Sequence, residues 1–357
     1  MLKSLHLENF TVFQNTRLEF GKNLNIIIGE NGSGKSHILN VAYTPIALSA
    51  DRHPEGGGDL YFSKEGLARK LQTVFRPDGL GRLVRRQRGR HNCRLAYFFD
   101  KPELDLAFTF STVAKNAVTL EKAPKVRVEK RPIFLPTREL LSIYPGFVSL
   151  YETTELQFPE TWCDTCILLG APLARGPREG SIKKLLEPLE IAMGGSIDLD
   201  KSGRFYLNLP SGSMEMHLVA EGLRKLGMIA RLIATGSLLD KGYLFWDEPE
   251  ANLNPKIVKA VAKTILQIAQ NGIQVFIATH SLFLMRELQI LQQQDFQALD
   301  IQCFGLHIGE AGAVNMQQGK TMDDVGDISS LEEELAQSDR YLESEAKISP
   351  NIEGPKN

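Results

Sequence analysis

Two adjacent carboxylates, Asp247 and Glu248, directly follow four large apolar residues, YLFW at 243–246. Such a run is typical of a buried strand. Desolvating a charged side chain costs several kcal/mol per ion unless a partner compensates for it. The two acids therefore indicate a site that binds a cation, unless the strand ends in solvent and both acids are simply hydrated.

A segment near the N-terminus supplies a partner for these acids. The sequence GENGSGKS at 29–36 has the spacing G-x-x-x-x-G-K-[ST], in which backbone amides surround phosphates, a lysine reaches the β- and γ-phosphates and a hydroxyl binds Mg²⁺. A predicted strand at 24–28 precedes it, and a predicted helix from residue 36 has an N-terminus that favours anions. The residues expected to contact the nucleotide are Gly29, Asn31, Gly32, Ser33, Gly34, Lys35 and Ser36.

With a phosphate-binding loop in the chain, the two acids have a function. A carboxylate at the end of a neighbouring strand holds the metal, and the next one can activate the attacking water. We therefore expect Ser36 and Asp247 to bind Mg²⁺ and Glu248 to be the general base. The charge of the metal would offset the cost of keeping the acids there.

A third strand, predicted at 273–278, is followed by His280. A single histidine after a core strand is more often structural, but here one helix separates it from the carboxylates. Asn254 and Pro255 are typical of the start of that helix, and Asn271-Gly272 of its end. The order strand, helix, strand predicts a parallel sheet, with the three motifs at one edge, where such folds bind ligands.

Composition indicates an ordinary soluble protein. The chain has 357 residues, 43% of them hydrophobic and 24% charged, and a net charge of −2, so charge alone attracts it to neither nucleic acid nor membranes. No apolar run reaches the ~20 residues that span a bilayer, and the N-terminus lacks the features of a signal peptide. We expect a cytoplasmic protein. Four cysteines do not indicate a disulfide scaffold, and we interpret C-x-x-C at 163–166 as structural rather than redox-active or zinc-binding.

Together these motifs resemble the ABC-type ATPase heads of the SMC, RecF and OLD branch. The opening LKSLHLENF, the phosphate-binding loop, DEPEANLNP at 247–255 and ATHS at 278–281 carry the resemblance, which covers most of residues 1–315. The sequence looks most like the small stand-alone ATPases of this branch that work with a partner protein in phage defence. The resemblance implies an α/β P-loop NTPase fold, ATP and Mg²⁺ as cofactors, and a homodimer or higher homo-oligomer that sandwiches two ATP molecules.

The resemblance also implies roles for three further residues. His280 would sense the γ-phosphate, Asn254 would belong to a D-loop at the dimer interface, and Gly222 would contact the partner's nucleotide from a signature motif. The segment VAEGL at 219–223 differs from the usual L-S-G-G-Q, because Ala220 replaces the serine. Arg224 or Lys225 is a candidate substitute, and the alternative is an ordinary amphipathic helix.

A second departure concerns the Q-loop, whose usual glutamine is missing. Thr137, Arg138 and Glu139 occupy its place, and we expect Arg138 or Glu139 to lie near the nucleotide.

The expected domain organisation is an ATPase head at 1–317 and an acidic tail at 318–357. Within the head, residues 51–130 would form an antiparallel β-subdomain, and residues 148–214 a small insertion with helices at 154–169 and 181–192 and a hairpin turned at 201–203. The insertion lacks the sustained heptads of an SMC coiled coil. In the tail we expect a helix at 330–346 and ten disordered residues after it. About forty residues leave no room for the Toprim nuclease domain of OLD proteins, so no intrinsic nuclease is expected.

Three functions remain open from the sequence. The first is an ATP-driven switch that dimerises and controls an effector protein, in defence against phage. The second is a RecF-like repair ATPase that binds DNA through the arginine-rich segment from Arg82 to Arg94. The third is an ATP-bound scaffold with little turnover. The arginine-rich segment could equally be a solvated surface, or pair with the acidic tail of another subunit.

Overall fold

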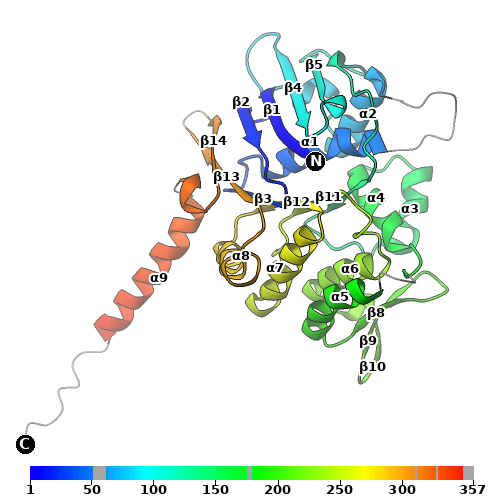
Figure 1. Ribbon diagram of the computed structural model, residues 1–357, viewed down its shortest axis with the longest axis vertical. Helices are drawn as coiled ribbons and strands as arrows, with labels where there is room; N and C mark the ends of the chain where they lie inside the picture. Colours follow the sequence, from blue (N-terminus) through cyan, green and yellow to red (C-terminus); the bar gives the residue numbers. More distant parts are fainter. Residues whose placement is uncertain (51–61, 175–178, 310–311, 327–328, 349–357) are drawn as a thin grey trace, which may run out of the picture.

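The computed structural model describes residues 1–50, 62–174, 179–309, 312–326 and 329–348. Its centre is a six-stranded sheet in the order β14-β13-β3-β12-β11-β7 (Figure 1). All neighbouring strands are parallel except β13 and β14. The strands are β3 (Leu24–Gly29), β7 (Pro132–Leu135), β11 (Tyr243–Asp247), β12 (Gln274–Thr279), β13 (Ile301–Ile308) and β14 (Val314–Gly319).

Helices cover both faces of this sheet, which is why its inner strands are almost continuously apolar. Side chains alternate between the faces, so that Phe245 packs in the core that contains α1, and Trp246 packs in the core that contains α6 and α7. Figure 1 shows α7 and α8 below the sheet. The helices are α1 (Lys35–Ala50), α6 (Glu221–Ala234), α7 (Pro255–Gln270) and α8 (Leu282–Asp295).

A second, antiparallel sheet lies above α1, in the order β2-β1-β4-β5-β6 (Figure 1). Within residues 51–130, where an antiparallel β-subdomain is expected, β4, β5 and β6 are antiparallel neighbours, and β4 also pairs with β1. The elements of this half are β1 (Leu2–Phe10), β2 (Phe13–Glu19), β4 (Asn92–Phe99), β5 (Leu106–Ser111), β6 (Thr119–Lys122) and α2 (Lys64–Phe75), with the short 3₁₀ helices η1 (Leu80–Leu83) and η2 (Pro102–Leu104).

The insertion between β7 and α6 forms a compact lobe. The prediction of one helix over 154–169 is wrong: α4 begins at Glu160, and α3 ends at Thr153. Pro159 explains the break, because a proline disfavours helical geometry in the residue before it. The predicted helix at 181–192 and the hairpin are confirmed, with Gly203 in the turn at a φ of +80°. The elements are α3 (Tyr144–Thr153), α4 (Glu160–Leu169), α5 (Glu179–Met193), β8 (Ser196–Leu199), β9 (Phe205–Leu209), β10 (Gly212–Glu215) and the 3₁₀ helix η3 (Met216–Leu218).

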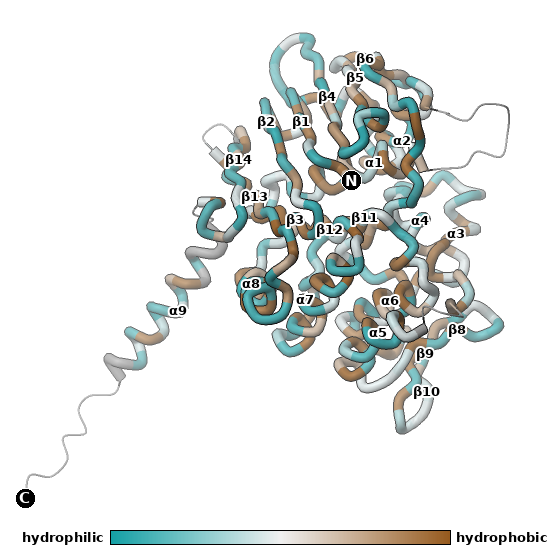
Figure 2. The backbone as a smooth tube through the Cα atoms, viewed as in Figure 1, coloured by the Kyte–Doolittle hydropathy of each residue, from teal (hydrophilic) through white to brown (hydrophobic). Residues whose placement is uncertain are grey.

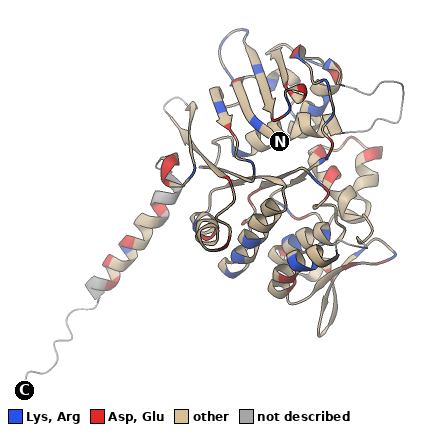
Figure 3. Cartoon of the chain, in the orientation of Figure 1, with Lys and Arg blue, Asp and Glu red and all other residues tan. Residues whose placement is uncertain are grey.

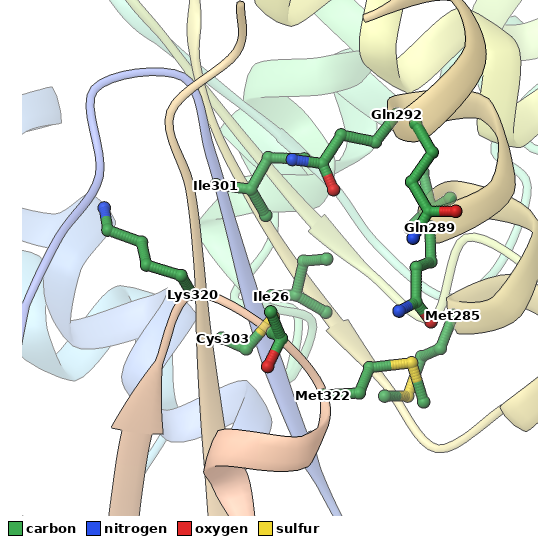
Figure 4. Close-up of a pocket in the computed structure, with 11 residues that line it drawn as sticks. Ile26, Met285, Gln289, Gln292, Ile301, Cys303, Lys320 and Met322 are labelled. Atoms are coloured by element: carbon green, nitrogen blue, oxygen red, sulfur yellow. The ribbon is translucent and has the colours of Figure 1, made fainter. Parts of the chain in front are cut away.

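The chain then leaves the central sheet through β14 and the 3₁₀ helix η5 (Asp323–Val325). A small cavity of about 70 Å³ marks where this segment packs on α8, with Met285, Cys303 and Met322 around it (Figure 4). The predicted tail helix is confirmed as α9 (Ser329–Ile348), which projects away from the rest of the molecule in Figure 1. The expected disorder at the C-terminus concerns residues outside the described part of the chain.

Figure 2 shows hydrophilic and hydrophobic bands alternating along α9. In the described part of the chain, no helix is long and apolar enough to span a membrane.

Candidate nucleotide-binding site

The three motifs meet at one edge of the central sheet, as the order of the elements predicts. Strands β3, β12 and β11 are parallel neighbours, and their registers pair Ile28 with Thr279 and Ala278 with Asp247. The phosphate-binding loop, the carboxylates and His280 therefore follow the carboxyl ends of adjacent strands. Ligands of open α/β sheets bind at this edge.

Glycine is required at three positions of the phosphate-binding loop. Gly32 and Gly34 have φ values of +86° and +93°, in the left-handed region that other residues rarely adopt. At Gly29 a Cβ atom would lie 2.6 Å from the Ser33 Oγ and 2.8 Å from the Leu306 carbonyl oxygen. The glycines at these positions therefore allow the loop to curve tightly and to approach a ligand closely.

Lys35, the first residue of α1, points back into this loop. Its Nζ donates to the backbone carbonyl oxygens of Gly29 at 2.8 Å and Glu30 at 3.0 Å. Burial lowers the pKa of Lys35, and the nearby charges of Glu248 and Asp247 oppose that shift. The ammonium group is therefore held at the loop, where a phosphate group can replace the carbonyl oxygens as its partner.

The environment of Asp247 is typical of a carboxylate that binds a cation. Burial raises its pKa, while a hydrogen bond with the Ser36 side chain lowers it. Its Oδ1 is buried and has no hydrogen-bond partner among the described residues, although such atoms are usually satisfied. A hydroxyl and a buried carboxylate are oxygen ligands of the kind that Mg²⁺ prefers, so these two residues fit the metal.

Glu248 and His280 face each other at the ends of neighbouring strands. The His280 Nδ1 lies 3.3 Å from the Glu248 Oε1, and the imidazole side chain is 41% exposed. Glu248 adopts a φ of +47°, unusual for a residue other than glycine, and its N–H donates to the Ala278 carbonyl oxygen at 2.9 Å. Such backbone strain is often kept at functional sites. The arrangement can position a water molecule and sense a terminal phosphate.

Two buried charged side chains, Glu250 and Lys225, stabilise the loops at this edge of the sheet. The sequence motifs did not predict this role for either residue. The Glu250 Oε1 accepts from the Thr279 hydroxyl at 2.6 Å, which joins the loop after β11 to the end of β12. Lys225, only 1% exposed, donates from Nζ to the carbonyl oxygens of Glu248 at 2.5 Å and Ala251 at 3.4 Å. Burial lowers the pKa of Lys225 to about 8. The sequence of an amphipathic helix does not indicate that one of its lysines is buried in this way.

Gly222 and Asn254 lie together in a groove with Asn252, next to the loop that follows Glu248. At Gly222 a Cβ atom would lie 2.6 Å from the Asn252 carbonyl oxygen, so the α6 N-terminus packs closely against this loop. The Asn254 Oδ1 accepts from the Ile257 N–H at 3.0 Å and caps α7 as expected. The roles of Gly222 and Asn254 in nucleotide binding stay predictions.

The residues considered as substitutes in the signature motif and the Q-loop are already engaged. The Arg224 Nε lies 2.7 Å from the Glu139 Oε1, and Glu139 also accepts from the Ser142 hydroxyl at 2.6 Å. Lys225 is buried beneath the loop after Glu248, whereas Arg138 is exposed. In this structure α6 is therefore tied to the Q-loop position by an ion pair. Proximity of Arg138 or Glu139 to the nucleotide stays a prediction.

The C-x-x-C pair fits the structural interpretation. Cys163 and Cys166 are buried free thiols in α4. Burial raises their pKa values to about 11 and about 12, so neither is a thiolate at neutral pH.

Fold and site together define an ABC-type ATPase head of the SMC and RecF branch. The chain belongs to the family described as "AAA domain, putative AbiEii toxin, Type IV TA system", whose model matches residues 50–286. A second family model, "AAA domain", matches residues 4–41. At the level of the family, the chain is therefore an ATPase.

Solved structures of low sequence identity share the fold. An Smc head bound to the C-winged helix domain of ScpA is 15% identical, with a TM-score of 0.53 over 90% of this chain and 98% of that one. An Smc head with an extended coiled coil, bound to the C-terminal domain of ScpA derived from Pyrococcus furiosus, is 11% identical, with a TM-score of 0.52 over 96% and 99% of the two chains.

Curated relatives are DNA replication and repair proteins RecF. The protein from Pediococcus pentosaceus is 35% identical over 73 residues, 20% of this chain and 19% of that protein. The protein from Trichormus variabilis is 28% identical over 131 residues, 35% of each chain. The chain thus spans about a third or less of the length of these relatives.

Proposed function

We propose that this protein is an ATP-hydrolysing switch that binds ATP and Mg²⁺, dimerises around two nucleotides and thereby controls an effector protein. The observation that carries the proposal is the convergence of Lys35, Asp247 and Glu248 at one sheet edge. Lys35 would hold the β- and γ-phosphates, Asp247 with Ser36 would hold Mg²⁺, and Glu248 would accept a proton from the attacking water.

Dimerisation is supported by the separate location of the signature segment. Gly222, Asn252 and Asn254 line a groove that contains no residue of the phosphate-binding loop, as residues that complete a partner's site would. The Smc heads named above are bound to domains of another protein, ScpA, which supports an effector that docks on the head. The toxin and antitoxin description of the family supports a role in defence against phage.

Replacing Glu248 with Gln tests the proposal. The amide keeps the size of the side chain but cannot accept the proton, so hydrolysis should fall by about 10²-fold or more while ATP binding persists. The trapped nucleotide should hold the dimer, measured by light scattering with ATP and Mg²⁺ alongside phosphate release. Glu152→Gln, an exposed residue of α3, is the matched control.

Two outcomes would contradict different parts of the proposal. Hydrolysis by Glu248→Gln at the wild-type rate would remove Glu248 from its role as base. A mass that does not respond to ATP, beside slow turnover in the wild type, would favour the scaffold function instead.

A RecF-like DNA-associated ATPase is the second candidate. Arg82, Arg86, Arg88 and Arg90 are exposed and form no ion pair with described residues, so they are free to contact phosphates. The curated relatives are named as DNA replication and repair proteins. Stimulation of ATP hydrolysis by DNA, lost in Arg85→Gln/Arg86→Gln/Arg88→Gln, would favour this function, and unchanged hydrolysis would count against it.

A further inference from the structure

A large groove opens where α5, the start of α6, α7 and α8 meet, and it is the groove that contains Gly222, Asn252 and Asn254. Its volume is about 790 Å³, and we call it the α5–α8 groove. Three exposed lysines of α7 line it: Lys256, Lys259 and Lys263. Their spacing of three and seven residues places them on one side of the helix. None forms an ion pair with another described residue. Glu287 of α8 also lines the groove, so three lysines and one carboxylate leave it with a net positive charge.

Apolar side chains from α5 and α8 also line the α5–α8 groove. Ile191 of α5 is 74% exposed, and Leu291 of α8 is partly exposed. An exposed apolar surface beside a row of like charges is typical of a binding site for a partner that supplies both apolar and acidic groups.

The tail helix α9 has the complementary composition. Leu335 and Leu342 are 42% and 65% exposed, and their spacing of seven residues places both on one face. Asp339 and Glu343 flank this face on one side, and Glu345 flanks it on the other, at 100° per residue. Residues 329–348 contain six acidic and two basic side chains, a net charge of −4. Figure 3 shows the acidic bands along α9 and the basic bands on α7.

We propose that α9 of a second copy of this chain docks in the α5–α8 groove. The lengths agree, because Leu335 to Leu342 and Lys256 to Lys263 each span seven residues, about 10 Å along a helix. Helices in water owe most of their stability to the packing of an apolar face. Figure 1 shows that α9 projects away from the rest of the molecule. The apolar face of α9 is therefore available to another molecule.

Exchange of tails between two copies forms the same contact twice, as in a two-fold symmetric dimer. The contact uses no residue of the phosphate-binding loop. It therefore forms without nucleotide and weakens as salt screens the charges. Gly222, Asn252 and Asn254 line the same groove, so a docked tail and a dimer around ATP exclude each other. Association without nucleotide tests the tail contact alone, and its failure would leave dimerisation around ATP untouched.

Reversal of charge on each side tests the contact in the full chain without nucleotide. We expect light scattering to show association of the wild type at low salt. Lys256→Glu/Lys259→Glu/Lys263→Glu should weaken it at least about tenfold, and so should Asp339→Lys/Glu343→Lys/Glu345→Lys. Mixing the two variants should restore association, because each tail then meets a groove of opposite charge.

The control for charge alone is Lys64→Glu/Lys115→Glu/Lys125→Glu, three exposed lysines of the other half of the molecule. It should associate as the wild type does. A wild type that stays monomeric, equal association of all variants, or a mixture that stays monomeric would each overturn the proposal. A monomeric wild type whose tail loses protection from protease only in the groove variant would instead place α9 in its own groove.

Discussion

Replacement of Lys225 by Met removes a buried ammonium group that holds the backbone of the proposed base. The Lys225 Nζ donates to the Glu248 carbonyl oxygen at 2.5 Å, where Glu248 has a φ of +47°. Left-handed geometry costs a residue other than glycine about 1–3 kcal/mol unless its surroundings hold it. Without Lys225 this carbonyl loses a charged donor, so the Glu248 carboxylate should leave its place beside His280. We expect ATP hydrolysis to fall at least about tenfold.

The change in stability follows from the pKa. Burial lowers the pKa of Lys225 from its ordinary 10.5 to about 8. At about 1.4 kcal/mol for each pKa unit, this disfavours the charged folded form by roughly 3 kcal/mol. Removing the amine relieves that cost but leaves a buried carbonyl oxygen unsatisfied, which costs about 1–3 kcal/mol. The two effects largely cancel, so Lys225→Met should fold with a free energy of unfolding close to that of the wild type at pH 7.

The pH dependence separates this reasoning from a purely structural effect. Between pH 8 and 10.5 the unfolded chain binds more protons at Lys225 than the folded chain, so this residue makes stability rise with pH. Its contribution between pH 7 and pH 9 is about 1 kcal/mol. Urea unfolding at both pH values should show this difference between wild type and Lys225→Met. Equal pH dependence together with wild-type hydrolysis would refute the role assigned to Lys225.

Two further predictions concern the surroundings of the site. Asn254→Ala removes the side chain that caps α7 and should lower the free energy of unfolding by about 1 kcal/mol in urea titrations, whereas Asn254→Asp should retain most of it; equal loss in both variants would argue against the cap. Because burial raises the pKa values of Cys163 and Cys166 to about 11 and about 12, both thiols should resist a thiol reagent at pH 8 until denaturant is added; rapid labelling of Cys166 in the native protein would contradict that.

The sequence predicted the phosphate-binding loop and its partners because their signals are local. Glycine spacing between Gly29 and Ser36 reflects backbone geometry within eight residues, and the apolar run before Asp247 marks a strand that is buried on both faces. Alternation of strands and helices then predicts that these ends share one sheet edge. The helix predicted at 154–169 begins only at Glu160, because Pro159 restricts the residue before it and an apolar pattern does not report that restriction.

Other features depend on contacts that no local pattern encodes. Lys225 and Glu250 look like ordinary charged residues in the sequence, and only the packing of α6 and β12 against the loop after β11 buries them. The α5–α8 groove likewise joins residues from four helices between 188 and 291. The nucleotide motifs and the parallel order of their strands could be predicted from the amino-acid sequence, since they follow from backbone conformation and hydrophobic periodicity. Which charged side chains are buried and which surfaces are exposed could not be predicted in this way, because burial depends on neighbours that are distant in the chain.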